Sequence, residues 1–427
     1  MKIYRSENCG ELLTRAFDER TRELAAVKEI LAAVREKGDE AVFGYEAKFD
    51  ATYLTKENFR VSEQEFEEAE RAVEPEFLES LKKAIDNIYA YHARTGRRDN
   101  VLEHEGRTTG YVVRAVERAG IYVPGGTAPL SSSVLMGVLP AKAAGVGRIV
   151  ITTPAKEGKV SPYTLAAAKA CGVTEVYKCG GAQAIAALAY GTESVPKVDV
   201  IAGPGNIFVT LAKKEVYGQV GIDMLAGPSE ILIVADGAAN PAYVAADVLS
   251  QAEHDVLARA IVITTDGALA EKIAAEVEMQ LRALPREQIA RASIEKSGGI
   301  IVVGSLGRAC ELANEIAPEH LELYVEDPAA LLPKIRNAGA VFLGGYTPEP
   351  VGDYFAGPDH ILPTSGSAKF FQVLNEDIFT RKMSVISYTK EALFADGADI
   401  IRLADSEGLG AHANAVAIRM KEREERK

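Results

Sequence analysis

Four of the six histidines lie in the second half of the chain, beside polar or glycine-rich sequence, namely His254, His320, His360 and His412. Gln251 precedes His254 at a spacing that places the two side chains about one helical turn apart. Nitrogen and oxygen donors without cysteine suit Zn²⁺ or a similar divalent ion that keeps open positions for a substrate. These spacings match no compact zinc motif such as HExxH, and an isolated histidine is more often a hydrogen-bonded surface residue. The residues are therefore candidates for a metal site.

His254 and Asp255 also form an HD pair, the motif of helical metal-dependent phosphohydrolases. Those enzymes are all-helical, whereas strand-like sequence flanks the pair in this chain. A hydrolase is therefore an alternative that the surrounding pattern disfavours. The remaining histidines, His92 and His104, lie in or after an N-terminal helical part and receive no role.

Short glycine-rich turns at 124–126, 180–183 and 203–206 follow predicted strands. In an open parallel sheet, ligands bind at the carboxyl ends of strands, and helix N-termini there offer free N–H groups to phosphate. A dinucleotide is the obvious candidate ligand. None of the turns completes the G-x-G-x-x-G fingerprint, since Phe208 stands where a third glycine belongs. Ordinary tight turns of a parallel sheet explain each turn equally well.

Two series of short apolar strands alternating with helices must position these residues. In the first series, strands are expected at 148–153, 175–179 and 198–202, and helices at 133–144, 163–170, 182–190 and 206–216. In the second series, strands are expected at 231–235, 260–264, 299–303, 323–325 and 340–343, with helices between them. Strands and helices of these lengths imply βαβ units and parallel sheets. We predict two α/β domains of similar plan.

The remaining segments complete a four-part division of the chain. Residues 11–98 read as mostly helical, with one run at 66–95, and 111–123 as strands or a hairpin. Residues 345–370 should form a long ordered loop, and 393–427 a helical tail. The predicted domains are a helical region 1–109, α/β domains 110–226 (NAD side) and 227–370 (zinc and catalytic residues), and a helical region 371–427.

The composition excludes several classes of function. The chain has 427 residues, with 48 Lys or Arg against 61 Asp or Glu, so its net charge is −13. An acidic chain has no general attraction for nucleic acid or anionic membranes. The four cysteines form no CxxC pair, which favours free thiols in a reducing cytoplasm. Neither a secretory signal nor the roughly 20 apolar residues of a membrane span is evident. We expect a soluble cytoplasmic protein.

Eight longer segments are more specific than any single short pattern. They are IYVPGGTAPLSSSVLMGVLPA, GGAQAIAALAYGT, IAGPGNIFVT, LAGPSEIL, LSQAEHD, APEHLEL, GPDHILPTSG and EGLGAHANAV. In their types and order these segments resemble the histidinol dehydrogenases, and the resemblance runs over nearly the whole chain. One segment, KFFQVLNEDIF, is less typical of that family.

The resemblance implies an enzyme that oxidises L-histidinol to L-histidine through bound L-histidinal, by two successive hydride transfers to NAD. This reaction is the last step of histidine biosynthesis. The implied fold has four domains, two of them incomplete Rossmann-like α/β units, with a helical N-terminal region and a small C-terminal helical region. The implied assembly is an intertwined homodimer whose active sites draw on both subunits.

The resemblance also implies roles for particular positions. The implied zinc ligands are Gln251, His254, Asp353 and His412. Glu319 is implied to activate water, and His320 to act as the general base. The implied substrate positions are these four ligands with His320, Ser229, His360 and Glu407. The implied NAD positions are Tyr122, Gln183 and Asn206, in a family whose NAD site lacks the usual glycine fingerprint.

These roles fit the chemistry of the side chains. Alcohol oxidation needs a base for the hydroxyl proton, and histidine works near neutral pH because its ordinary pKa is about 6.5. An adjacent carboxylate can activate the water that the second oxidation requires. Consecutive residues on an extended segment point apart, so a bend at Glu319 and His320 is required. Zinc would orient the substrate through its imidazole and amine.

Two further alternatives remain open. A related dehydrogenase of the same superfamily would act on another small polyol or amino alcohol, for example a sulfonated propanediol. It would share Glu319 and His320 but differ at the positions that meet the substrate, Glu407 and His360. Glu407 can pair with a substrate ammonium, which favours an amine-bearing substrate. A catalytically silent binding protein is disfavoured, because every expected catalytic position is filled.

Overall fold

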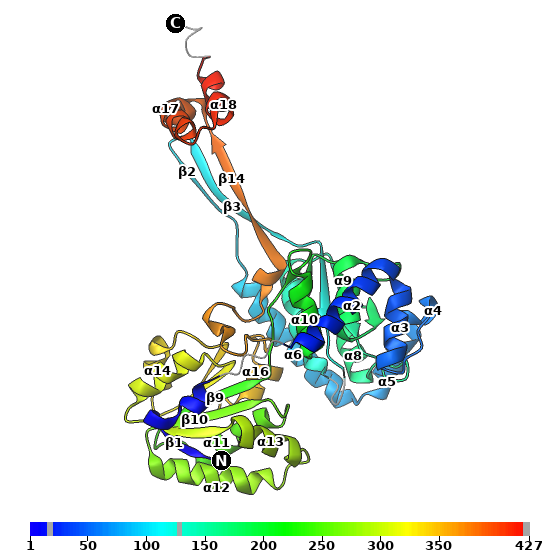
Figure 1. The fold of residues 1–427 in the computed structure, drawn as a ribbon, viewed down its shortest axis with the longest axis vertical. Coiled ribbons are helices and arrows are strands. Elements are labelled where there is room, and N and C mark those ends of the chain that lie inside the picture. Colours follow the sequence, from blue (N-terminus) through cyan, green and yellow to red (C-terminus); the bar gives the residue numbers. More distant parts are fainter. Residues whose placement is uncertain (15–19, 126–129, 422–427) are drawn as a thin grey trace. The chain divides into compact units, whose positions relative to one another are not determined.

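A computed structural model of the chain describes residues 1–14, 20–125 and 130–421. It divides into two compact units (Figure 1). The larger unit comprises residues 1–95 and 116–379, and the smaller comprises 96–115 and 380–427. Gly126 of the first glycine-rich turn, residues 15–19 of the predicted helical region and 422–427 of the charged tail lie outside the described residues.

The first sheet of the larger unit is parallel, with the strand order β6-β5-β4-β7-β8. Its strands are β4 (Arg118–Tyr122), β5 (Arg148–Thr153), β6 (Val176–Lys178), β7 (Val200–Ala202) and β8 (Gly221–Ile222). Its helices are α7 (Ser131–Ala144), α8 (Pro162–Ala170), α9 (Gly181–Tyr190) and α10 (Ile207–Val216). The structure confirms the first predicted series of strands and helices.

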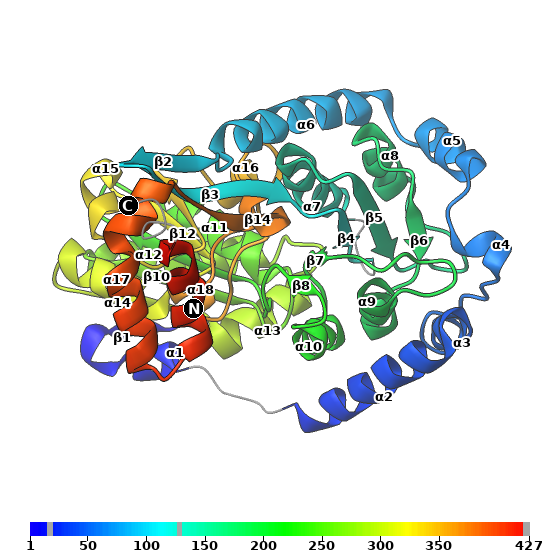
Figure 2. The ribbon, with the colours of Figure 1, turned by 90° about the horizontal axis from the view of Figure 1, so that it is seen from above.

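Both faces of this sheet are covered, as parallel strands require. In β5, Ile151 packs with residues of α7 and α8, whereas the preceding Val150 packs with residues of α9 and α10. Figure 2 shows α2 (Thr21–Lys37) and α3 (Asp39–Phe49) beside α9 and α10, and α6 (Pro75–Thr95) beside α7. The N-terminal helices therefore form an outer layer on both sides of the first sheet.

The N-terminal region is mostly helical, as predicted, and also contains α1 (Gly10–Leu13), α4 (Lys56–Phe59) and α5 (Glu63–Ala72). The expected single run at 66–95 is wrong, because α5 ends at Ala72 and α6 begins at Pro75. Proline disfavours a helical conformation in the residue before it but suits the first turn of a new helix. The proline therefore separates two helices that share one apolar pattern.

The second sheet is also parallel, with the strand order β1-β11-β10-β9-β12-β13. Its strands are β1 (Ile3–Arg5), β9 (Glu230–Ala235), β10 (Arg259–Thr264), β11 (Gly299–Val302), β12 (His320–Tyr324) and β13 (Ala340–Leu343). The helices between them are α11 (Pro241–Ala252), α12 (Gly267–Leu281), α13 (Glu287–Ser297) and α14 (Leu306–Ile316). Two parallel α/β sheets confirm the predicted fold class.

Two strands of the second sheet differ from the prediction. β1 pairs with β11, so the first residues belong to this sheet instead of the helical region. β12 begins at His320, ahead of the predicted start at Leu323. The buried polar residues His320 and Glu322 interrupt the apolar pattern that marks a core strand.

The segment after β12 contains α15 (Pro328–Leu331), α16 (Glu349–Tyr354) and the 3-10 turns η3 (Ser367–Lys369) and η4 (Glu376–Phe379). The segment 345–370, predicted as a long loop, therefore carries the helix α16 and the turn η3.

The smaller unit combines an antiparallel sheet with two helices. Its strand order is β14-β3-β2, formed by β2 (Asn100–His104), β3 (Arg107–Ala115) and β14 (Thr380–Tyr388). The helices α17 (Lys390–Ser406) and α18 (Gly410–Met420) confirm the predicted helical tail. Residues 371–427 are not wholly helical, however, because β14 lies among them. Residues 111–123 do form strands, but β3 and β4 belong to different units and make no hairpin. The four-domain division of the chain stays a prediction.

Candidate active site

The adjacent residues Glu319 and His320 meet at the start of β12. Ala317 ends α14 in the left-handed conformation, with φ 49°, and turns the chain ahead of them. The Glu319 carboxylate accepts a hydrogen bond from the backbone N–H of Glu230 at 2.8 Å, and His320 Nδ1 lies 3.1 Å from the Glu230 carbonyl oxygen. Glu319 Oε2 is 3.7 Å from His320 Nδ1. The bend that the sequence required is present.

The contact with Glu230 determines which ring nitrogen of His320 is available. A carbonyl oxygen only accepts, so Nδ1 carries the hydrogen. Nε2 is buried, and the described part of the chain offers it no hydrogen-bond partner. It faces two carboxylates of α16, Glu349 Oε1 at 3.9 Å and Asp353 Oδ1 at 3.7 Å. His320, Glu349 and Asp353 together could hold a metal ion.

Burial and charge shift the pKa values of this group in a consistent way. Desolvation raises the pKa of Glu319 to about 8. For His320 desolvation alone would lower the pKa, but the surrounding carboxylates, with Glu319 foremost, outweigh it and raise the pKa to about 10. For Asp353, desolvation acts to raise the pKa. The contact with His320 and the charges of His360 and His320 outweigh it and keep the pKa below the usual range. The surrounding carboxylates therefore favour the protonated form of His320.

Sequence reasoning missed Glu349, which is 2% exposed. It precedes Asp353 by one helical turn in α16, a spacing in the sequence that identifies a shared face. Ser250, at the end of α11, donates a hydrogen bond to Glu349 Oε2 at 2.9 Å. This contact joins the end of α11, which carries Gln251, to the start of α16, which carries Asp353.

Gln251 is fully buried in the last turn of α11, and neither end of its side-chain amide has a hydrogen-bond partner among the described residues. A buried amide without partners costs free energy. The position of Gln251 therefore suits a side chain that binds a ligand. His254 follows the end of this helix. Desolvation lowers the pKa of His254, the charge of Asp353 raises it, and the charge of His320 lowers it. Nitrogen, amide oxygen and carboxylate donors are a set that suits zinc.

The remaining substrate positions fall in two places. His360 Nδ1 lies 4.0 Å from Asp353 Oδ1, and Ser229 directly precedes Glu230. Glu407 and His412 belong to the smaller unit, at the end of α17 and in the first turn of α18, and both are exposed. The structure thus brings His254, His320, Asp353 and His360 close to one another. The shared role of Glu407 and His412 stays a prediction.

The expected NAD residues lie at the carboxyl edge of the first sheet. Tyr122 ends β4, and its hydroxyl accepts a hydrogen bond from the Gly181 N–H at 3.2 Å. Asn206 caps α10 by accepting from two backbone N–H groups. Gln183 Nε2 donates to Glu46 Oε1 at 2.8 Å, and the N–H of Gly180 donates to the same oxygen at 2.9 Å. Sequence reasoning missed Glu46, which reaches this edge from α3.

A buried ion pair supports the glycine turn that precedes α10. Lys213 Nζ donates to the Gly203 carbonyl oxygen at 2.9 Å, and Asp223 accepts from the Gly203 N–H at 2.8 Å. Lys213 and Asp223 also form an ion pair. Gly203 has φ 119°, and a Cβ there would lie 2.0 Å from the Tyr122 carbonyl oxygen. Only glycine fits this position.

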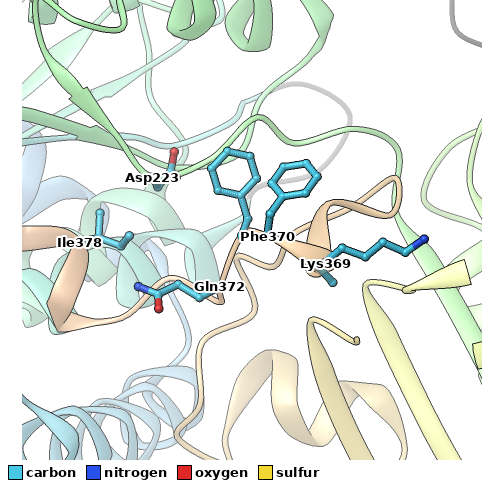
Figure 3. A pocket seen from close by; sticks show the side chains of 7 residues that line it. Asp223, Lys369, Phe370, Gln372 and Ile378 are labelled. Carbon is cyan, nitrogen blue, oxygen red and sulfur yellow. The ribbon is translucent and has the colours of Figure 1, made fainter. Parts of the chain in front are cut away.

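A cavity of about 480 Å³ lies beside this support. Its lining comprises Asp223, Ile378 and residues 368–372. Figure 3 shows Lys369, Phe370 and Gln372 on one segment of the lining, with Asp223 and Ile378 nearby. The cavity includes part of the segment KFFQVLNEDIF and none of the expected site residues.

No helix in the described residues combines the length and apolar character needed to cross a membrane.

Comparison with known proteins gives a consistent result. A family model described as histidinol dehydrogenase matches residues 13–420. The chain is 55% identical over 398 residues to a histidinol dehydrogenase of Bacillus cereus, with 93% of this chain and 92% of that protein covered. It is 52% identical over 395 residues to one of Carboxydothermus hydrogenoformans, with 92% and 93% covered.

Solved structures agree. A crystal structure of histidinol dehydrogenase from Elizabethkingia anophelis matches with a TM-score of 0.95 and 38% identity, over 99% of each chain. An acetylating aldehyde dehydrogenase from Geobacillus thermoglucosidasius matches with a TM-score of 0.50 and 13% identity, over 88% of this chain and 98% of that one. The second likeness shows a shared fold alone.

Proposed function

Because this chain belongs to the histidinol dehydrogenase family, a family of oxidoreductases in histidine biosynthesis, we propose that it converts L-histidinol to L-histidine through L-histidinal, with two NAD and a zinc ion. The observation that carries the proposal is the meeting of Glu319, His320 and Asp353 at one edge of the second sheet. Membership of this family sets aside the hydrolase and the silent binding protein.

The residues of the site fit a zinc ion. Gln251, His254 and Asp353 would hold it, together with His412, and the unpartnered amide of Gln251 supports this set. When bound, zinc would act as a Lewis acid that holds the imidazole and amine of the substrate in one orientation. For His320 to act as a base, its Nε2 must give up the proton that the surrounding carboxylates, with Glu319 foremost, favour there.

The first oxidation uses His320 as the base. Nε2 takes the hydroxyl proton while hydride passes from the substrate carbon to NAD, which leaves the aldehyde. Glu319 then takes a proton from water as the water adds to the aldehyde carbon, and His320 returns its proton to the aldehyde oxygen, which gives the hydrate. The hydrate loses the second hydride to another NAD and one hydroxyl proton to the freed His320, and the resulting carboxylic acid releases its remaining proton to become the carboxylate. The raised pKa of Glu319, about 8, suits a group that takes up and releases protons near neutrality.

We further propose that the protein works in the cytoplasm as a homodimer. In this arrangement Glu407 and His412 of one subunit complete the site of the other, and Tyr122, Gln183 and Asn206 line the NAD site. The charge of Glu407 suits the substrate ammonium.

The decisive experiment follows NADH absorbance with L-histidinol and NAD, after zinc loading and again after chelation. We expect two NADH per histidinol, a loss of activity on chelation and recovery with Zn²⁺. If a folded, zinc-loaded dimer forms no NADH from histidinol, a different small polyol or amino alcohol is the substrate, and a panel of such compounds identifies it.

A further inference from the structure

A second ionisable cluster lies next to the candidate site, where its member Asp359 directly precedes His360. The reaction outlined above does not use this cluster. His92 belongs to α6, Asp359 to the segment between α16 and η3, and Glu376 to η4. They are only 1%, 3% and 4% exposed. Ionisable groups buried to this extent are retained when they have partners or a function.

The ring of His92 joins the two carboxyl groups. Nδ1 lies 2.9 Å from Glu376 Oε2, so Nδ1 donates its hydrogen to that carboxylate. Nε2 faces Asp359 Oδ2 at 4.0 Å, and neither atom has a hydrogen-bond partner among the described residues. Burial lowers the pKa of His92 and raises that of Asp359 well above its ordinary value. At 4.0 Å these two atoms form a close polar contact that is longer than a hydrogen bond.

Asp359 in turn shapes the backbone around His360. Its Oδ1 accepts a hydrogen bond from the Ile361 N–H at 2.7 Å, which closes a turn with His360 in the middle. The Ile361 carbonyl oxygen then accepts from the Leu374 N–H at 2.9 Å. The position of the His360 ring thus depends on where the Asp359 carboxyl group is held.

The helix α6 supports the same segment at two further points. Asn87 donates a side-chain hydrogen bond to the Phe355 carbonyl oxygen at 3.1 Å. Gly357 approaches Tyr91 so closely that an added Cβ would lie 2.9 Å from the Tyr91 Cβ. Asn87, Tyr91 and His92 lie on one face of the helix. This face of α6 therefore contacts the segment 355–361 at several points.

We propose that His92 is a positioning residue, which sets the place of His360 in the substrate site by holding Asp359 from behind. This inference rests on the proposed function, in which His360 meets histidinol. His92 itself touches no reactant.

The test is the variant His92→Phe, which keeps an aromatic ring but removes both nitrogens. We expect the KM for L-histidinol to rise about tenfold or more, because small misplacements of a positioning group are costly. The KM for NAD should stay within about twofold, since the NAD residues belong to the other sheet. The conservative variant Asp359→Asn should keep the histidinol KM near the wild-type value. Its amide can turn an N–H toward Nε2 of His92 and still accept from the Ile361 N–H.

A matched control separates positioning from general destabilisation. Ile88→Ala removes a fully buried side chain one turn earlier on α6, so it should lower Tm without changing the histidinol KM. An unchanged KM in His92→Phe, or an equal rise in Ile88→Ala, would overturn the proposal. If His92→Phe does not fold, Asp359→Ala must show the same selective rise in KM. Failure of the wild-type enzyme to oxidise histidinol would instead overturn the proposed function.

Discussion

At the scale of single residues, the buried amide of Gln251 is the clearest sign of an expected ligand. Nothing in the described chain satisfies its oxygen or its nitrogen. A core that buries such a group carries a cost of about 1–3 kcal/mol until a partner arrives. Gln251 should therefore destabilise the metal-free protein against unfolding and stabilise the metal-bound one.

We expect Gln251→Leu to raise the Tm of the chelated protein, because it removes the unsatisfied amide at similar volume. The variant should also lose most of the Tm increase that Zn²⁺ gives the wild type, since ligand binding stabilises by mass action. Thermal unfolding with a chelator and with added Zn²⁺ measures both effects. A lower Tm in the chelated variant would contradict this account.

Glu46 supplies a pH-dependent test at the other sheet. Desolvation raises its pKa from 4.5 to about 7, so the folded state keeps a proton that the unfolded state has lost. Between these values the free energy of unfolding should fall as pH rises, by about 3 kcal/mol in total. Glu46→Gln keeps the acceptor for Gln183 without the charge and should lack this fall.

Urea unfolding at pH 5, 6, 7 and 8 checks the expectation. Glu40→Gln is the matched control, because it lies on the same helix but is exposed, and it should follow the wild type. Equal pH dependence in the wild type and in Glu46→Gln would show that Glu46 is not held protonated.

At the scale of elements, the candidate sites lie at the carboxyl ends of the strands in the first sheet and at the amino ends in the second. The glycine turns and Tyr122 follow the carboxyl ends of β4, β6 and β7, as the general rule for parallel sheets expects. Ser229, His320 and the turn after α11 instead lie at the amino ends of β9, β12 and β10. In the first sheet, the candidate ligand site is therefore formed by the geometry of the turns. In the second sheet, it is formed by buried ionisable side chains.

The turn at Gly203 depends on Lys213 of α10, so Lys213→Met should be strongly destabilising. It leaves Asp223 buried without its cation, at a cost of about 3–5 kcal/mol. It should also raise the KM for NAD, because the turn belongs to the proposed nucleotide site. Urea unfolding and NAD kinetics measure both effects, with the exposed neighbour variant Lys214→Met as the control. A loss no larger than that of the control would mean that the pair does not support the turn.

At the scale of the whole molecule, the expected site residues divide between the two units. Glu319, His320 and Asp353 belong to the larger unit, and Glu407 and His412 to the smaller. In the proposed homodimer, each smaller unit serves the site of the partner subunit. This arrangement predicts that a monomeric form has little activity.

Complementation tests the shared site. Glu319→Ala and His412→Ala should each be inactive alone, but a heterodimer of the two has one intact site. Equal mixing with full subunit exchange should restore about a quarter of the wild-type activity, because half of the dimers are mixed. Two inactive parents that show no recovery, despite verified exchange, would count against sites shared between subunits.

The sequence alone predicted the two parallel sheets, because the alternation of short apolar strands with helices is a local pattern. Its long motifs also indicated the family. They could not show that Glu46, His92 and Glu349 matter, since their roles arise from contacts with distant segments. His92 and Glu376 are 284 residues apart in the chain, and Glu46 and Gln183 are 137 apart. Burial creates those roles by removing water from charged groups and leaving each one dependent on its neighbours, and only the tertiary structure decides which neighbours those are.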